Sequence, residues 1–271
     1  MLARALAGLL PPLSYDEQIE ITKLHSITGE EIDGIMTTRP FRSPHHTSSH
    51  VSIIGGGTKP LPGEVSLAHR GVLFLDELPE YPRQSLEALR QPLEDRKVHI
   101  SRAAGRLTYP ADFMLVATKN PCPCGYYGDP AHECSCTQQQ LLNYQKRISG
   151  PLMDRIDMVV QVSRVKETSL LDHQAEPESP ALQELVATAR DRQLRRHKGS
   201  RTNASLSSKE ITSSAKLEDE AKKLLNSAAE RMNLSARSYF KVLKVARTIA
   251  DLDDSETIKP AHLAEALSYR A

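Results

Sequence analysis

The decapeptide GVLFLDELPE, from Gly71 to Glu80, joins a run of apolar residues to two adjacent acids. Val72 to Leu75 predict a short strand of the apolar kind that parallel sheets bury on both faces. Asp76 and Glu77 would then lie at the carboxyl end of that strand, where open α/β sheets bind their ligands. A Walker B site needs this arrangement, with one carboxylate for the Mg²⁺ of a nucleotide and one to polarise the attacking water. The same pattern also suits an ordinary strand followed by a polar loop.

The residues after these acids continue an alternation of helix and strand. Residues 78–95 predict a helix with three leucines on one face, closed by Pro92 and a charged exit. The next segment predicts an outward hairpin, followed by a second apolar strand from Phe113 to Ala117. That strand ends in a polar cluster that includes Asn120, which would otherwise be a turn residue before a proline.

Four long motifs carry a resemblance to a known family: RPFRSPHHTSSHVSIIGGG (Arg39 to Gly57), PGEVSLAHRGVLFLDELPE (Pro62 to Glu80), NPCPCGYYGDP (Asn120 to Pro130) and ISGPLMDRIDM (Ile148 to Met158). They resemble the magnesium-chelatase-like AAA+ ATPases of the ComM/YifB type. The likeness covers essentially the whole chain, because LSARSYFKVLKVARTIADL (Leu234 to Leu252) resembles the C-terminal helical domain of the same family. The resemblance implies an α/β fold: an AAA+ parallel-sheet core that lacks its phosphate loop and first strand, followed by an all-α helical lid domain.

The resemblance also implies nucleotide chemistry at particular positions, with ATP and Mg²⁺ as cofactors. Asp76 would hold the Mg²⁺ and Glu77 would polarise the water. Asn120 would be the sensor 1 residue on the neighbouring strand.

His45 and His46 lie beside a predicted strand. A histidine pair there is more often a hydrogen-bonded scaffold than a metal site, and we assign them no catalytic role.

Two arginines match motifs whose arginines contact the nucleotide phosphates in this family. Arg155 resembles an arginine finger, which a subunit offers to the γ-phosphate bound by its neighbour in a ring. Arg147 is a second candidate for that role, and the alternative for Arg155 is a salt bridge with Asp154 or Asp157. Arg237 resembles the sensor 2 arginine of the lid, which would contact the phosphates; the alternative is a solvated residue in the first turn of a helix.

One departure from the family is that GxxxxGK[ST] does not occur in these 271 residues. The backbone N–H groups of that loop cradle the phosphates, its lysine neutralises them and its Ser or Thr binds Mg²⁺. Residues 1–14 resemble the helix that follows the loop. We therefore expect a fragment of an ATPase, truncated just after the Walker A motif and inactive by itself; the alternative is a naturally shortened, non-hydrolysing paralogue.

The composition is that of a protein without a membrane span. The chain carries 25% charged residues, a formal net charge of +1 and 10 histidines. This balance excludes a bulk polyanion-binding surface, so any contact with nucleic acid has to be local. The apolar N-terminal segment is short and lacks a signal-peptide cleavage pattern, which favours a cytoplasmic location.

A change in composition marks the predicted domain boundary. Residues 1–165 would form the partial core, including a last strand from Met158 to Val165 and a Cys-rich insert over 120–137. Residues 166–180 lose apolar periodicity and would be a linker. Residues 181–271 predict a bundle of helices, one of which is capped by Ser235.

The four cysteines of the chain, Cys122, Cys124, Cys134 and Cys136, lie within 15 residues of one another. Four thiolates suffice for tetrahedral Zn²⁺, although structural zinc sites usually space their ligands by two to four residues. His132 could replace one sulfur. The alternatives are a reduced structural loop and redox-labile thiols.

Two arginines of the predicted hairpin are candidates for DNA binding. Arg102 and Arg106 flank small residues, at the place where related motors project a hairpin into the ring channel, and guanidinium groups there would contact phosphates. The Gly- and Ser-rich stretch from Thr47 to Pro62 would form a second channel loop. Either segment would equally suit a solvated hairpin.

The resemblance implies an ATP-driven motor subunit, a homo-oligomer that forms a hexameric ring. The expected activity is DNA translocation on single-stranded or branched DNA, used for branch migration during transformation or recombination. A chelatase-type motor that remodels a protein is the alternative among enzymes. A non-hydrolysing DNA-binding or assembly module is the alternative outside them.

Overall fold

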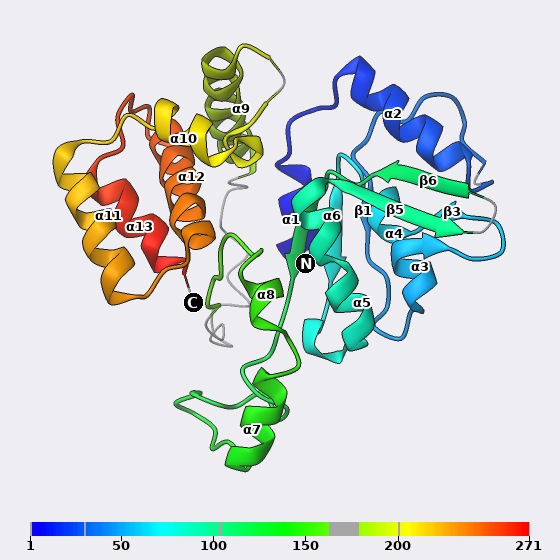
Figure 1. Ribbon diagram of the computed structural model, residues 1–271, viewed down its shortest axis with the longest axis horizontal. Coiled ribbons are helices and arrows are strands. Elements are labelled where there is room, and N and C mark those ends of the chain that lie inside the picture. Colours follow the sequence, from blue (N-terminus) through cyan, green and yellow to red (C-terminus); the bar gives the residue numbers. More distant parts are fainter. Residues whose placement is uncertain (1, 30, 103–104, 163–178, 200, 271) are drawn as a thin grey trace. The chain divides into compact units, whose positions relative to one another are not determined.

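The computed structural model describes residues 2–29, 31–102, 105–162, 179–199 and 201–270 (Figure 1). Its contacts divide the chain into two compact units. The first comprises Met1–Gly8 and Pro12–Arg155, and the second comprises Leu9–Pro11 and Ile156–Ala271. The predicted linker falls almost wholly on residues 163–178, outside the described part of the chain, so the predicted domain bounds remain a prediction.

A parallel sheet of three strands lies at the centre of the first unit. Its order is β1 (Phe41–Arg42), β4 (Val72–Leu75) and β7 (Met114–Ala117). β4 pairs with both neighbours, with Val72 opposite Phe41 on one side and Leu75 opposite Ala117 on the other. The predicted strands around Gly71–Glu80 and Phe113–Ala117 are therefore confirmed. The apolar run of β4 forms a strand because its position in the middle of the sheet buries it from both sides.

Short helices surround this sheet: α1 (Leu2–Gly8), α2 (Tyr15–Ser26), α4 (Glu64–Leu67), the 3₁₀ turn η1 (Leu78–Glu80), α5 (Arg83–Ala88) and α6 (Arg90–Asp95). The sequence predicted one helix here, closed by Pro92, whereas the structure has two helices that meet at Leu89, with Pro92 inside the second. Pro92 divides the predicted helix, because proline lacks the N–H that would bond to the carbonyl of Ala88 and its ring clashes with that carbonyl. Leu86 and Leu89 are nonetheless buried in the main core, as their spacing predicted.

The predicted hairpin is formed by β5 (Lys97–Arg102) and β6 (Gly105–Pro110), which pair antiparallel. A smaller hairpin joins β2 (Gly55–Gly56) to β3 (Leu61–Pro62) after the helix α3 (His50–Ile54). A Cβ at Gly55 would meet the carbonyl oxygen of Leu61 at 2.7 Å, and its φ is +106°, so this close approach requires glycine.

The predicted strand from Met158 to Val165 is wrong over its described part. Residues 156–162 have no regular structure, and Val160 and Val162 are exposed. A strand exists only through hydrogen bonds to a neighbouring strand. Here the amide of Val159 instead donates to the carbonyl of Tyr269 in the same unit, at 2.8 Å. The first unit ends with α7 (Gln138–Gln145) and α8 (Gly150–Met153).

The second unit is helical, as the sequence predicted, with α9 (Ser179–His197), η3 (Asn203–Ser205), α10 (Ser208–Ser214), α11 (Asp219–Arg231), α12 (Ala236–Leu252) and α13 (Pro260–Ser268). The predicted cap is confirmed, because the Ser235 hydroxyl accepts a hydrogen bond from the amide of Ser238 at the start of α12. Val242 and Leu243 of α12 are buried in a separate apolar core. This core is built from small and aliphatic side chains, since the chain has no tryptophan.

Candidate functional site

Asp76 and Glu77 directly follow β4, and both are exposed at its carboxyl end. Thr118, which directly follows β7, holds the two strand ends together. Its hydroxyl donates to Asp76 Oδ1 at 2.5 Å and accepts the backbone N–H of Glu77 at 3.0 Å. Its carbonyl accepts the N–H of Leu78, at 2.8 Å. The two acids thus occupy one fixed edge of the sheet, where parallel strands present ligand-binding groups.

Sequence reasoning gave Thr118 no role, because its partners are 41 and 42 residues away. A usable signal does exist in the sequence. A hydroxyl residue ends the strand that neighbours the acid pair, and the strand pairing brings equivalent strand ends side by side. The register between β4 and β7 decides which residue meets Asp76, and a single sequence does not supply that register.

Glu77 has an unusual backbone, with φ of +53° and ψ of +52°. This left-handed conformation costs a residue other than glycine about 1–3 kcal/mol, and such strain collects at functional sites. The turn leaves the Glu77 side chain 53% exposed, with one carboxylate oxygen 3.8 Å from Nδ1 of His46. His46, to which the sequence assigned no catalytic role, therefore lies next to the predicted catalytic acid.

Tyr81 supports this side of the site from beneath. Its ring meets the His46 ring edge-on, and its hydroxyl donates to the carbonyl of Pro44 at 2.6 Å. Burial, with a smaller contribution from the charge of Asp76, raises the pKa of Tyr81 to about 12. Tyr81 therefore stays protonated and serves as a hydrogen-bond donor at neutral pH.

Asn120 is exposed two residues beyond Thr118, so it follows the strand that neighbours β4, as predicted. Its backbone lies near the hydroxyl of Tyr144, a buried residue of α7, and opposes the rise in the pKa of that hydroxyl that burial causes. The position fits a residue that faces a nucleotide from the end of β7. Its chemical role remains a prediction.

Arg155 has only 12% of its side chain exposed. It donates to the backbone carbonyls of Arg90 and Pro151, at 2.9 and 2.8 Å, and forms an ion pair with Glu94. All three partners lie within its own unit.

Arg147 is more open, with 50% of its side chain exposed. It donates to Glu80 at 2.6 Å and to the carbonyl of Pro79 at 3.3 Å. These partners belong to η1, the turn that directly follows Glu77. Arg147 therefore lies on the same edge of the sheet as the two acids.

Arg237 lies exposed in the first turn of α12, in the second unit. Arg102 and Arg106 lie on the two strands of the β5–β6 hairpin, close to its tip, and Arg106 is exposed. The Arg102 side chain is outside the described part of the chain. Nucleotide and DNA contacts for these three arginines remain predictions.

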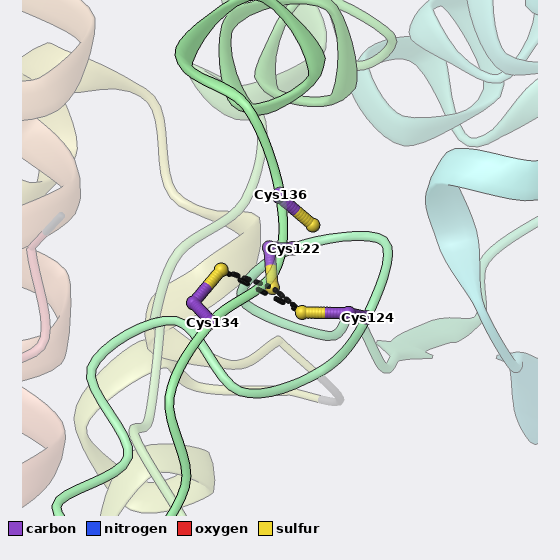
Figure 2. Close-up of side chains that lie close together, drawn as sticks. All are labelled: Cys122, Cys124, Cys134 and Cys136. Atoms are coloured by element: carbon purple, nitrogen blue, oxygen red, sulfur yellow. Dashed lines mark hydrogen bonds between the residues drawn. The ribbon is translucent and has the colours of Figure 1, made fainter.

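The four cysteines converge in the loop that joins β7 to α7 (Figure 2). Their sulfur atoms all lie within 4.8 Å of one another. The sulfur of Cys122, which is buried, is 3.3 Å from that of Cys124 and 3.7 Å from that of Cys134. A hydrogen bond from the backbone N–H of Tyr126 contributes most to lowering the pKa of Cys124, to about 5. His132 lies outside this group, where its ring stacks on Tyr126.

Comparison with known proteins identifies the family. A family model for magnesium chelatase, subunit ChlI, matches residues 1–170, and the model for its C-terminal region matches residues 176–270. The chain belongs to this family. Its three-stranded parallel sheet and helical C-terminal region fit a partial AAA+ core followed by an all-helical lid, as the sequence predicted.

Relatives match along the whole chain. The chain is 45% identical over 273 residues to the competence protein ComM of Haemophilus influenzae, and 44% identical over 274 residues to the YifB protein of Escherichia coli. Both alignments cover 100% of this chain and 53% of the relative. The protein Rv2897c of Mycobacterium tuberculosis is 41% identical over 276 residues, with 54% of its length covered. This magnesium chelatase family chain thus spans about half the length of the curated relatives that it matches.

Across the described helices, none combines the length and the apolar character that a membrane crossing requires.

Proposed function

We propose that this chain is part of an ATP-dependent AAA+ motor subunit. The observation that carries the proposal is the acid pair at the end of β4, tied through the Thr118 hydroxyl to the end of β7. Mg²⁺ prefers oxygen ligands such as carboxylates, so the exposed Asp76 would hold the Mg²⁺ that accompanies a bound nucleotide. Membership of the magnesium chelatase family supports nucleotide and Mg²⁺ use.

In this proposal Glu77 polarises the water that attacks the γ-phosphate, and Asn120 orients it. The strained turn at Glu77 and the Thr118 bridge hold the acids in place before the nucleotide binds, which is how a site avoids rearrangement during the reaction. No GxxxxGK[ST] motif occurs within the 271 residues. We therefore propose that this chain alone does not hydrolyse ATP, because it lacks the loop that would cradle the phosphates.

Two arginines would complete the site in a hexameric ring. Arg155 would act as the arginine finger toward the nucleotide of a neighbouring subunit. To do so it has to exchange its partners within the first unit for phosphate, which would make hydrolysis depend on ring assembly. Arg147, with half of its side chain exposed, is the second candidate. Arg237 would be the sensor 2 residue that links the lid to the nucleotide state.

The proposed substrate is single-stranded or branched DNA, moved by ATP hydrolysis during transformation or recombination. A 45% identical relative is a competence protein, which supports this choice. Arg102 and Arg106 would contact DNA phosphates from the β5–β6 hairpin. Two alternatives have specific support: the family's chelatase name favours a motor that remodels a protein, and the missing phosphate-loop motif favours a non-hydrolysing DNA-binding or assembly module.

The test compares ATP turnover, with and without forked DNA, for this chain and for a chain extended to supply GxxxxGK[ST]. We expect only the extended chain to turn over, to be stimulated by DNA, and to lose turnover in Glu77→Gln. If neither chain hydrolyses ATP while both bind DNA, the module alternative stands.

A hairpin variant separates the DNA motor from the protein remodeller. In the extended chain, Arg102→Ala with Arg106→Ala should remove DNA stimulation and leave basal ATP turnover intact. Lys97→Ala is the matched control, because Lys97 is an exposed cation at the base of the same hairpin. Unchanged DNA stimulation in the double variant would contradict a DNA motor that uses this hairpin.

A further inference from the structure

We propose that Cys122, Cys124, Cys134 and Cys136 bind one structural Zn²⁺, and that this zinc site braces the carboxyl ends of β4 and β7. The zinc site is inferred from the positions of the cysteines alone. Its importance for Asn120 and Glu77 as catalytic residues rests on the proposed ATPase function.

The sulfur spacing matches a tetrahedral metal centre. With zinc–sulfur bonds of about 2.3 Å, tetrahedral geometry places the sulfur atoms about 3.8 Å apart. The sulfur separations are 3.3 Å for Cys122 and Cys124, 3.5 Å for Cys124 and Cys134, and 3.7 Å for Cys122 and Cys134. Cys136 lies within 4.8 Å of all three, on the side of the loop that leads into α7 (Figure 2).

A disulfide does not fit this arrangement. Bonded sulfur atoms lie about 2.05 Å apart, and all four cysteines are free. Three mutual separations of similar size describe sulfur atoms gathered around a common centre, whereas a disulfide would draw one pair together and leave the others apart. The C-x-C pairing, which is closer than usual for zinc ligands, is accommodated because Cys122 and Cys124 turn their sulfur atoms toward the same point (Figure 2).

The backbone around the cysteines has the form of a metal-binding turn. The N–H of Tyr127 donates to the sulfur of Cys122 at 3.3 Å. Gly125 and Gly128 adopt φ of +85° and +82°, so the chain can reverse twice within a few residues. Between Asn120 and α7 the loop has no regular structure, and Cys122 is its buried apolar residue. A loop with so little apolar core needs another source of stability, which a tetrathiolate metal centre provides.

The cysteine loop joins Asn120, which lies beyond the end of β7, to the helix α7. It begins at Asn120, two residues before Cys122, and ends at Cys136, beside the Thr137 that caps α7. The backbone of Asn120 lies close enough to the hydroxyl of the buried Tyr144 of α7 to influence the pKa of that hydroxyl. Arg147, just after α7, bonds to the turn that follows Glu77. Fixing the loop with a metal therefore also restrains α7, which is linked to Asn120 through Tyr144 and, through Arg147 beyond its end, to the turn that follows Glu77.

The first experiment measures the zinc content of the purified 271-residue chain by mass spectrometry. We expect about one zinc per chain, and near-complete loss in Cys122→Ser and in Cys134→Ser. His132→Ala and Ser135→Ala are matched controls in the same loop and should keep the metal. Replacement by Co²⁺ should give the visible spectrum of a tetrahedral thiolate site. A metal-free wild-type chain with four titratable thiols would overturn the zinc site, and zinc loss in His132→Ala would overturn the four-cysteine ligand set.

The second experiment tests the brace without relying on variants that fold poorly. Zinc is removed from the wild-type chain with a chelator and then restored, and backbone hydrogen exchange is followed in both states. We expect removal to accelerate exchange at least tenfold in α7 and at the amides of Leu78 and Glu80, to leave α2 unchanged, and to be reversed by zinc. Acceleration confined to residues 122–136 would overturn the brace.

Discussion

At the residue scale, a single hydroxyl group joins both strand ends of the proposed catalytic site. Thr118→Val removes the donor to Asp76 and leaves the N–H of Glu77 without its acceptor. We expect the free energy of unfolding of the first unit to fall by about 0.5–1.5 kcal/mol, the usual net contribution of a hydrogen bond, because water can reach the exposed groups that lose their partner. Hydrogen exchange of the Leu78 amide, which bonds to the Thr118 carbonyl, provides the measurement.

Thr118→Ser is the control for that prediction, because it retains the hydroxyl. It should keep most of the stability. A valine variant as stable as the wild type would show that the bridge contributes nothing to the fold.

A buried histidine gives the first unit a dependence on pH. Burial is the main cause that lowers the pKa of His69. Its Nδ1 accepts the N–H of Asp112 at 3.0 Å, and its Nε2 lies 3.1 Å from Glu20, so the neutral ring with Nε2–H fits both partners. Because the folded pKa lies below the unfolded value of about 6.5, the unfolded chain binds more protons between the two. Stability is then fully present above the unfolded pKa and decreases as the pH falls toward the folded pKa.

Denaturant unfolding of the first unit from about pH 8 to about pH 5.5 tests this sign. We expect the wild type to lose stability on acidification, and His69→Gln to show a flatter profile below pH 7 although it is less stable at neutral pH. A variant profile parallel to that of the wild type would assign the dependence to other groups. Glu20, whose pKa is lowered, contributes only at more acidic pH.

At the element scale, local patterns predicted the structure wherever an element is specified by its own residues. The strand β4, the β5–β6 hairpin and the helices of the second unit follow from runs and periods within a few residues. Two misses have physical causes. Pro92 divided a predicted helix, and residues 158–162 did not form a strand, because strand formation depends on a neighbour that the local sequence does not specify.

The residues of the candidate site divide in the same way. Asp76, Glu77 and Asn120 were placed correctly at strand ends, because a strand and the polar residue after it are local features. Thr118 and His46 were not foreseen, since their contacts depend on the register between β4 and β7 and on the path of the chain after β1.

The link between α9 and α12 depends on one buried acid. Asp251 bonds to Arg196 of α9 through both carboxylate oxygens and lies 3.1 Å from the fully buried Arg247. Asn203 also donates to it, at 2.8 Å. Asp251→Ala would leave two guanidinium groups without their shared anion. We expect the free energy of unfolding of the second unit to fall by about 3–5 kcal/mol, because removing one partner of a buried ion pair leaves the remaining charges buried and uncompensated.

Hydrogen exchange of the α12 amides measures this loss directly. Asp254→Ala is the matched control, because Asp254 also pairs with an arginine of α9, Arg192, yet its side chain is 77% exposed. Exposed pairs contribute about 0–1 kcal/mol. Equal effects of the two substitutions would contradict the assignment of the α9–α12 link to the buried acid.

At the scale of the whole molecule, the charge balance limits how this protein can bind DNA. A formal net charge of +1 on 271 residues gives no general attraction to a polyanion. DNA affinity therefore has to come from a few local cations, and the proposed motor assigns it to Arg102 and Arg106. Each phosphate contact releases condensed counterions, so the logarithm of the binding constant falls linearly with the logarithm of the salt concentration.

This gives a quantitative test of the hairpin. Binding of single-stranded DNA is titrated over a range of salt concentrations for the wild type, for Arg102→Ala with Arg106→Ala, and for Lys97→Ala. Losing two phosphate contacts should reduce the magnitude of the salt slope by about 1.4, since each contact contributes about 0.7 on a single strand. Lys97→Ala removes the same kind of charge from the far end of the hairpin and should leave the slope unchanged. Equal salt slopes for all three proteins would place the DNA contacts elsewhere on the chain. Equal reductions of the salt slope in both variants would indicate a diffuse electrostatic attraction, which the low net charge argues against.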